Sequence, residues 1–110
     1  MARIAIAEPH DEIRQLVAAI VSALGHEPVD ARDLGDGAPA DVLVLEPGDG
    51  AALQLAIRLR REQPDLPVII VSIYGPTHAT RALDPVAFLP KPFTLTELEH
   101  AIDIALDSSR

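Results

Sequence analysis

Four polar residues follow or close short apolar stretches of the chain, and their side chains could act together if the fold brings them into contact. Two are acids, one is a hydroxyl and one is an ammonium group: Glu8, Glu46, Ser72 and Lys91. Carboxylates attract a cation or a basic protein surface, and the hydroxyl and ammonium groups add hydrogen-bond donors. Whether these groups meet depends on the elements that carry them.

The apolar stretches have the composition of buried strands, because they are rich in Ile, Val and Leu and end at turn residues. A weaker stretch over residues 27–32 contains Pro28, which cannot donate a ladder hydrogen bond and therefore favours an edge position. The predicted strands cover residues 3–7, 27–32, 41–45, 67–73 and 86–89.

Segments with helical spacing of apolar residues alternate with these strands. Gly25 and Pro64 stop two of them, and Thr94 with Glu97 forms a capping box at the start of the last. The predicted helices cover residues 11–24, 51–63, 77–83 and 94–106. Residues 33–40 are rich in turn formers and leave no room for a full helix, and residues 77–83 allow about two turns at most.

This alternation predicts one α/β domain with a parallel sheet covered by helices on both faces. Right-handed crossovers make the sheet doubly wound, and ligands of such sheets bind at the carboxyl edge of the strands. Glu8, Glu46, Ser72 and Lys91 are all expected there. We assign residues 1–107 to the domain and residues 108–110 to a tail.

The composition and charge of the chain argue against several classes of function. The chain has 110 residues, a formal net charge of −8 and no cysteine. An acidic domain repels phosphate backbones and anionic lipid, so we expect neither nucleic-acid nor membrane binding. The apolar stretches are too short to span a bilayer, and no signal peptide is recognisable. We therefore expect a cytoplasmic protein.

Four segments together carry a family resemblance: residues 4–14, 40–46, 66–72 and 87–93. The last, Ala-Phe-Leu-Pro-Lys-Pro-Phe, is the most specific. Over nearly its whole length the chain resembles the receiver domain of two-component response regulators, in an atypical, pseudo-receiver form. The resemblance implies a flavodoxin-like, five-stranded parallel sheet of order 2-1-3-4-5. The chain departs from the family pattern in that the second helix is largely missing and the fourth is shortened. The resemblance also implies a cis peptide bond before Pro92.

The resemblance implies roles for the residues at the carboxyl edge. Receiver domains hold Mg²⁺ with an acidic pair, accept phosphate on an Asp, and bind the phosphoryl group with a Ser or Thr and a Lys. Glu8, Ser72 and Lys91 match this pattern. Pro9 replaces the second acid, and Glu46 stands at the position of the phosphoacceptor. Ser72 and Phe88 occupy the positions of the family's conformational switch.

The two departures weaken the expected chemistry. Mg²⁺ requires octahedral oxygen ligands, and Pro9 supplies none from its side chain. Glu46 is one methylene longer than Asp, and phosphoryl transfer is sensitive to misplacement of about 1 Å. We therefore expect no metal site; its weak candidate ligands are Glu8, Glu46 and the backbone of Gly48.

Several interpretations of Glu46 remain open. It could pair permanently with Lys91 and imitate an acyl phosphate, or the pair could be purely structural. Alternatively, phosphotransfer with Mg²⁺ could persist on a loop acid such as Asp49. Of the four histidines, His10 alone lies beside a pocket residue, Glu8.

We predict a signalling module that is not an enzyme and that binds a protein partner independently of phosphorylation. The partner could be a histidine kinase or an output protein. A homodimer through the face between the fourth strand and the last helix, near Tyr74 and Phe88, is also plausible from the resemblance. The alternative is a working phosphorelay receiver.

Overall fold

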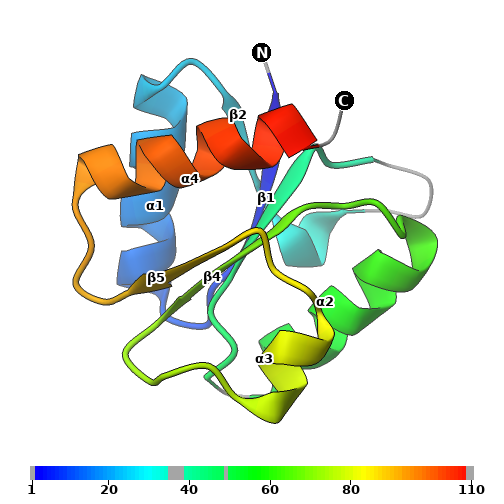
Figure 1. Ribbon diagram of the computed structural model, residues 1–110. Helices are drawn as coiled ribbons and strands as arrows, with labels where there is room; N and C mark the ends of the chain where they lie inside the picture. Colours follow the sequence, from blue (N-terminus) through cyan, green and yellow to red (C-terminus); the bar gives the residue numbers. More distant parts are fainter. Residues whose placement is uncertain (1, 35–38, 49, 109–110) are drawn as a thin grey trace.

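Five parallel strands form one sheet in the computed structural model of the protein, which describes residues 2–34, 39–48 and 50–108 (Figure 1). Their order across the sheet is β2-β1-β3-β4-β5, as predicted. The strands are β1 (Arg3–Ala7), β2 (Glu27–Asp30), β3 (Val42–Leu45), β4 (Val68–Ser72) and β5 (Ala87–Pro90).

The three central strands are apolar except for Arg3 at the start of β1 and Ser72 at the end of β4, because both faces of the sheet are covered. Every residue of β3 and β4 is buried, and so is β1 after its first residue. The edge strand β2 is only partly buried and accommodates Pro28, which would interrupt the hydrogen-bond ladder of a central strand.

In the described part of the chain, four α-helices and one short 3-10 helix cover the sheet: α1 (Asp11–Ala23), η1 (Ala31–Asp33), α2 (Ala51–Glu62), α3 (His78–Ala82) and α4 (Leu95–Ser108). Helices α1 and α4 lie on one face, and α2 and α3 lie on the other (Figure 1). The alternation of side chains along each strand divides the core in the same way. Ile4 and Ile6 pack with the α1 and α4 side, whereas Ala5 and Ala7 pack with the α2 side.

The connection between β2 and β3 lacks a full helix in its described part, as the turn-rich sequence predicts. Only η1 follows β2, and Ala31 and Leu34 bury their side chains there. Residues 35–38 of the predicted turn lie outside the described residues. The short α3 likewise agrees with the prediction.

Some predicted boundaries need correction. Arg32 belongs to η1 rather than to a strand, because Asp30 caps η1 by accepting a hydrogen bond from the Arg32 backbone N–H. Ser108 ends α4 rather than beginning a tail, since no Gly or Pro stops the helix earlier; residues 109–110 lie outside the described part. Among the described residues, no helix has the length and apolarity needed to cross a membrane.

Candidate functional site

Lys91 connects the two acids that the sequence places at the carboxyl edge of the sheet. Its Nζ lies 3.0 Å from Glu46 Oε2 and 3.1 Å from Glu8 Oε1. The acids follow the neighbouring strands β1 and β3, whereas Lys91 follows β5. The Lys91 backbone N–H donates to the Ser72 carbonyl, at 2.9 Å, and the peptide bond to Pro92 is cis. The ammonium group therefore reaches across β4.

This three-residue cluster is almost completely shielded from water. The side chains of Glu8, Glu46 and Lys91 are 2%, 6% and 13% exposed. Burying a charge is costly unless it is paired and hydrogen-bonded. Each carboxylate thus depends on the same ammonium group for compensation. The predicted contact between Glu46 and Lys91 is present, and the Glu8 contact with Lys91 is an addition that sequence reasoning did not predict.

Glu8 lies at the boundary between this cluster and solvent. Its Oε2 is buried and has no hydrogen-bond partner among the described residues. The Nδ1 of His10 lies 3.7 Å from Glu8 Oε1, and the His10 side chain is 70% exposed. His10 is thus at the rim, where the sequence places it, and when protonated it adds a second positive charge beside Glu8.

Structural comparison shows what this arrangement resembles. NtrX from Brucella abortus superposes with a TM-score of 0.82 and 27% identity; the match covers 98% of this chain and 28% of NtrX. A CheY-like receiver domain protein from Methanospirillum hungatei gives a TM-score of 0.85 at 17% identity over 99% of this chain and 96% of that one. The BeF3-activated DrrB receiver domain gives 0.80 at 18% identity, covering 97% and 98%.

The chain has the receiver-domain fold. No protein-family model and no curated protein sequence matches it significantly. The chain spans little more than a quarter of the length of NtrX.

Glu46, which the resemblance predicts to stand at the phosphoacceptor position, is held against the turn that follows β3. A Cβ atom built on Gly48 would lie 3.1 Å from Glu46 Oε1, which is tight for any side chain. Gly48 therefore lets the longer acid fold back over the turn while Oε2 reaches Lys91. Asp49, the alternative acceptor, lies outside the described residues.

Ser72 and Phe88, which the resemblance predicts to be switch positions, line a hollow that includes none of Glu8, Glu46 and Lys91. Ser72 is 3% exposed, and its Oγ accepts a hydrogen bond from the Tyr74 backbone N–H at 3.1 Å. Phe88 is partly buried and packs against the core on the α2 side. Both line a hollow of about 220 Å³ together with Tyr74 and Thr80. The Ser72 hydroxyl thus caps the loop after β4.

The oxygen donors near Lys91 do not fit a Mg²⁺ site. Glu8 and Glu46 each commit one carboxylate oxygen to the ammonium group, and Pro9 has no side-chain donor. Within residues 2–34, 39–48 and 50–108, no group of three or more acidic, His or Cys side chains is arranged to hold a metal ion. A cation bound at Glu8 Oε2 would be repelled by the Lys91 ammonium group, whose Nζ lies 3.1 Å from Oε1 of the same carboxylate.

A second charged cluster, around Asp30 at the end of β2, was missed by sequence reasoning. Asp30 accepts hydrogen bonds from Arg32 Nε and Nη2, at 3.1 and 2.7 Å, and its Oδ2 lies 3.3 Å from Arg14 Nε. The hydrogen bond from the Arg32 side chain is the main cause that lowers the pKa of Asp30. An Asp that caps the residue two positions later is a recognisable turn signal, but the Arg14 contact depends on the fold.

Proposed function

We propose that this receiver domain signals by binding a partner protein and does not depend on phosphorylation. The observation that carries the proposal is the contact of one ammonium group with two buried carboxylates, Lys91 with Glu46 and Glu8. In receiver domains the matching Lys binds the phosphoryl group. Here that Lys is already neutralised by residues of the chain itself.

The chemistry supports this proposal in two ways. A phosphoryl group entering beside Lys91 would have to displace the Glu8 or the Glu46 carboxylate from it. Among the described residues, Glu46 has no other ion pair and Glu8 has only the one with His10. In addition, the Glu46 carboxylate is displaced by one methylene from the position of an Asp, and transfer is sensitive to errors of about 1 Å. Both effects oppose phosphotransfer at position 46.

Exposed apolar side chains support a role in protein binding. Ile73 and Tyr74, after β4, are 68% and 66% exposed, and Leu95 at the start of α4 is 54% exposed. Exposed apolar side chains that adjoin one another are typical of protein contacts, and Ile73 and Tyr74 are neighbours in the chain. We propose that a kinase, an output protein or a second copy of the chain uses this region, and that the domain has no enzymatic activity of its own.

The test is incubation of the protein with Mg²⁺ and acetyl phosphate, followed by intact-mass measurement. We expect no gain of a phosphoryl group. The double variant P9D/E46D restores both acids that receiver domains use, and its phosphorylation under the same conditions shows that the assay works. A wild-type gain of one phosphoryl group that disappears in Asp49→Asn would establish the phosphorelay alternative instead.

A further inference from the structure

The hollow of about 220 Å³ that Ser72 and Phe88 line lies at the carboxyl ends of β3 and β4, between the first turn of α2 and the short helix α3. Leu53, Tyr74 and Phe88 supply apolar surface to it. A Cβ atom built on Gly75, which also lines it, would meet no atom beyond its chain neighbours within 4 Å. None of the described residues that line this hollow is charged at neutral pH.

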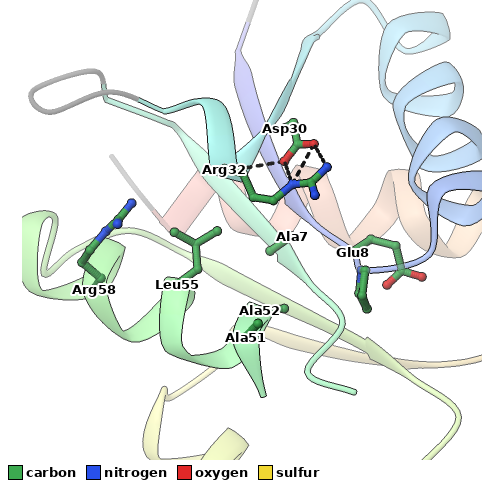
Figure 2. A pocket seen from close by; sticks show the side chains of 9 residues that line it. Ala7, Glu8, Asp30, Arg32, Ala51, Ala52, Leu55 and Arg58 are labelled. Carbon is green, nitrogen blue, oxygen red and sulfur yellow. Dashed lines mark hydrogen bonds and ion pairs between the residues drawn. The ribbon is translucent and has the colours of Figure 1, made fainter. Parts of the chain in front are cut away.

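The absence of charge distinguishes this hollow from a larger one, of about 390 Å³, that lies between α2 and the end of β2 (Figure 2). The larger hollow is lined by two acids and two arginines: Glu8, Asp30, Arg32 and Arg58. Its electrostatics therefore favour neither an anion nor a cation. In the smaller hollow a charged group would lose hydration and would find no opposite charge among the described lining residues, so a neutral occupant is favoured.

The size of the smaller hollow favours a single side chain over a free ligand. Pockets for small molecules typically enclose about 300–1,000 Å³, whereas this hollow encloses about 220 Å³. Exposed apolar surface adjoins it, because Tyr74 lines the hollow and both Ile73 and Tyr74 are largely exposed. Residues 66–77, which include β4 and the loop after it, contain no charged residue. Protein interfaces typically place an anchor side chain in such a pocket and surround it with contacts that exclude water.

Ser72 is a buried polar group of this hollow that has hydrogen-bonding capacity left over. Thr77 Oγ1 donates to Thr80 Oγ1 at 3.2 Å, and Thr80 Oγ1 donates to the Thr77 carbonyl at 3.1 Å, so both threonine hydroxyl protons are used. Ser72 is 3% exposed and its Oγ accepts from the Tyr74 backbone N–H, but its O–H donates to no described acceptor. A buried donor without a partner is costly, so an occupant that brings an acceptor gains from it.

We propose that this hollow receives one tyrosine side chain of the partner protein. The ring lies between Leu53 and Phe88, and its hydroxyl oxygen accepts a hydrogen bond from Ser72 Oγ. Tyrosine fits because it is neutral, with an apolar ring and a polar tip, which is the combination that favours it at interfaces. The inference rests on the proposed protein-binding function and gives it an anchor beside Ile73 and Tyr74. A second copy of the chain is disfavoured, since both copies carry a net charge of −8 and repel each other.

The test uses short peptides, capped at both ends, that share uncharged flanks of Ser, Ala and Val and carry Tyr, Phe, Ala or Glu at the centre. Amide NMR of the ¹⁵N-labelled protein locates the contact, and titration gives the Kd. We expect the Tyr peptide to shift the amides of Ser72, Gly75 and Thr80. The Phe peptide should bind roughly threefold to tenfold more weakly because it lacks one hydrogen bond. The Ala and Glu peptides should bind more weakly than the Tyr peptide by roughly tenfold or more.

Two variants separate the role of the space from that of the hydroxyl group. Gly75→Leu adds a side chain at the wall of the hollow, where its Cβ has room, and should weaken binding of the Tyr peptide roughly tenfold or more. Ser72→Ala should make the Tyr and Phe peptides bind equally without abolishing binding. Ala19→Leu is the matched control: it adds an apolar side chain at an exposed position of α1, on the other face of the sheet (Figure 1), and should leave the affinity unchanged. Circular dichroism checks that each variant is folded.

No binding of the Tyr peptide, equal affinity for the Tyr, Ala and Glu peptides, or amide shifts confined to other elements would overturn the proposal. An unchanged preference for Tyr over Phe in Ser72→Ala would do the same. If p-cresol, which is the tyrosine side chain alone, bound as tightly as the Tyr peptide, the hollow would be a small-molecule site instead. A dimer in analytical ultracentrifugation that dissociates in Gly75→Leu would also refute the proposal, because the occupant would then be a second copy of the chain.

Failure of the proposed function is measured separately. A phosphorylated wild-type protein that still binds the Tyr peptide at this hollow would refute phosphorylation independence and leave the anchor site standing. An unphosphorylated protein that does not bind the Tyr peptide would remove the anchor site and leave phosphorylation independence standing.

Discussion

At the scale of single residues, the central feature is that one cation compensates two buried anions. Lys91 contacts both Glu8 and Glu46, and all three side chains are nearly inaccessible to water. Such an arrangement stabilises the fold less than its short distances suggest, because burying the charges offsets much of their attraction. Removing one member is costly, however, because the remaining charges stay buried without a partner.

Substitution of Lys91 by Ala should therefore destabilise the protein by about 1–3 kcal/mol, towards the upper end because two carboxylates lose their partner. Urea unfolding of the wild-type protein and of Lys91→Ala measures the difference in the free energy of unfolding.

Arg61→Ala is the matched control, since it removes an exposed cation that has no ion pair with any described residue, and its free energy of unfolding should change little. An unchanged unfolding midpoint in Lys91→Ala would show that the cluster is not the buried, mutually dependent group described above.

At the scale of secondary-structure elements, most of the fold could be predicted from the sequence. Continuous apolar runs predict β3 and β4 because strands buried on both faces exclude polar residues. The turn-rich residues 33–40 predict that no full helix follows β2, and the described residues there form only η1. The boundary of β2 was less predictable, because Asp30 and Arg32 end the strand through a local hydrogen bond that competes with the ladder.

The candidate site was predictable in part for a physical reason. Parallel strands bring their carboxyl ends to one edge, so Glu8, Glu46 and Lys91 were expected to lie close together. The sequence cannot show how a long side chain divides its contacts. Lys91 contacts both acids, and Arg14 and Arg32 both contact Asp30. These contacts depend on side-chain directions that only the folded chain defines.

The Asp30 cluster links three elements, because Asp30 ends β2, Arg32 lies in η1 and Arg14 lies in α1. The hydrogen bond from Arg32 lowers the pKa of Asp30 from its ordinary value of 3.8. A group whose pKa is lowered by folding stabilises the protein above its unfolded pKa, and this contribution is lost as the pH falls through the folded pKa.

We therefore expect Asp30→Asn to destabilise the protein at neutral pH, and we expect the difference from wild type to shrink as the pH falls below 3.8. Urea unfolding across this range measures it. Arg32→Gln removes the main cause of the lowered pKa and should reproduce the same trend. A difference that is constant with pH would show that Asp30 contributes through packing or backbone capping rather than through its charge.

At the scale of the whole molecule, the net charge of −8 is distributed unevenly. The buried acids Glu8 and Glu46 contact Lys91 within the fold, whereas α2 carries the exposed cations Arg58 and Arg61. An acidic protein repels itself when compact.

Self-repulsion predicts that added NaCl stabilises the fold. Between about 0.01 and about 0.15 M salt, the screening length falls from about 30 to about 8 Å. Repulsion between distant exposed acids then weakens more than the attraction within buried pairs. Thermal unfolding should show Tm rising over this range. A falling Tm would indicate that the stabilisation by exposed ion pairs is larger than the destabilisation by the excess negative charge.

The most direct measurement of the central claim is ¹⁹F NMR of the protein with Mg²⁺ and beryllofluoride, which stands in for a phosphoryl group. The account predicts only the signals of free beryllofluoride species, because Glu8 and Glu46 already occupy Lys91, whereas P9D/E46D should give a bound signal. A bound signal from the wild-type protein that disappears in Lys91→Ala would contradict the claim that the pocket is filled by its own ion pairs.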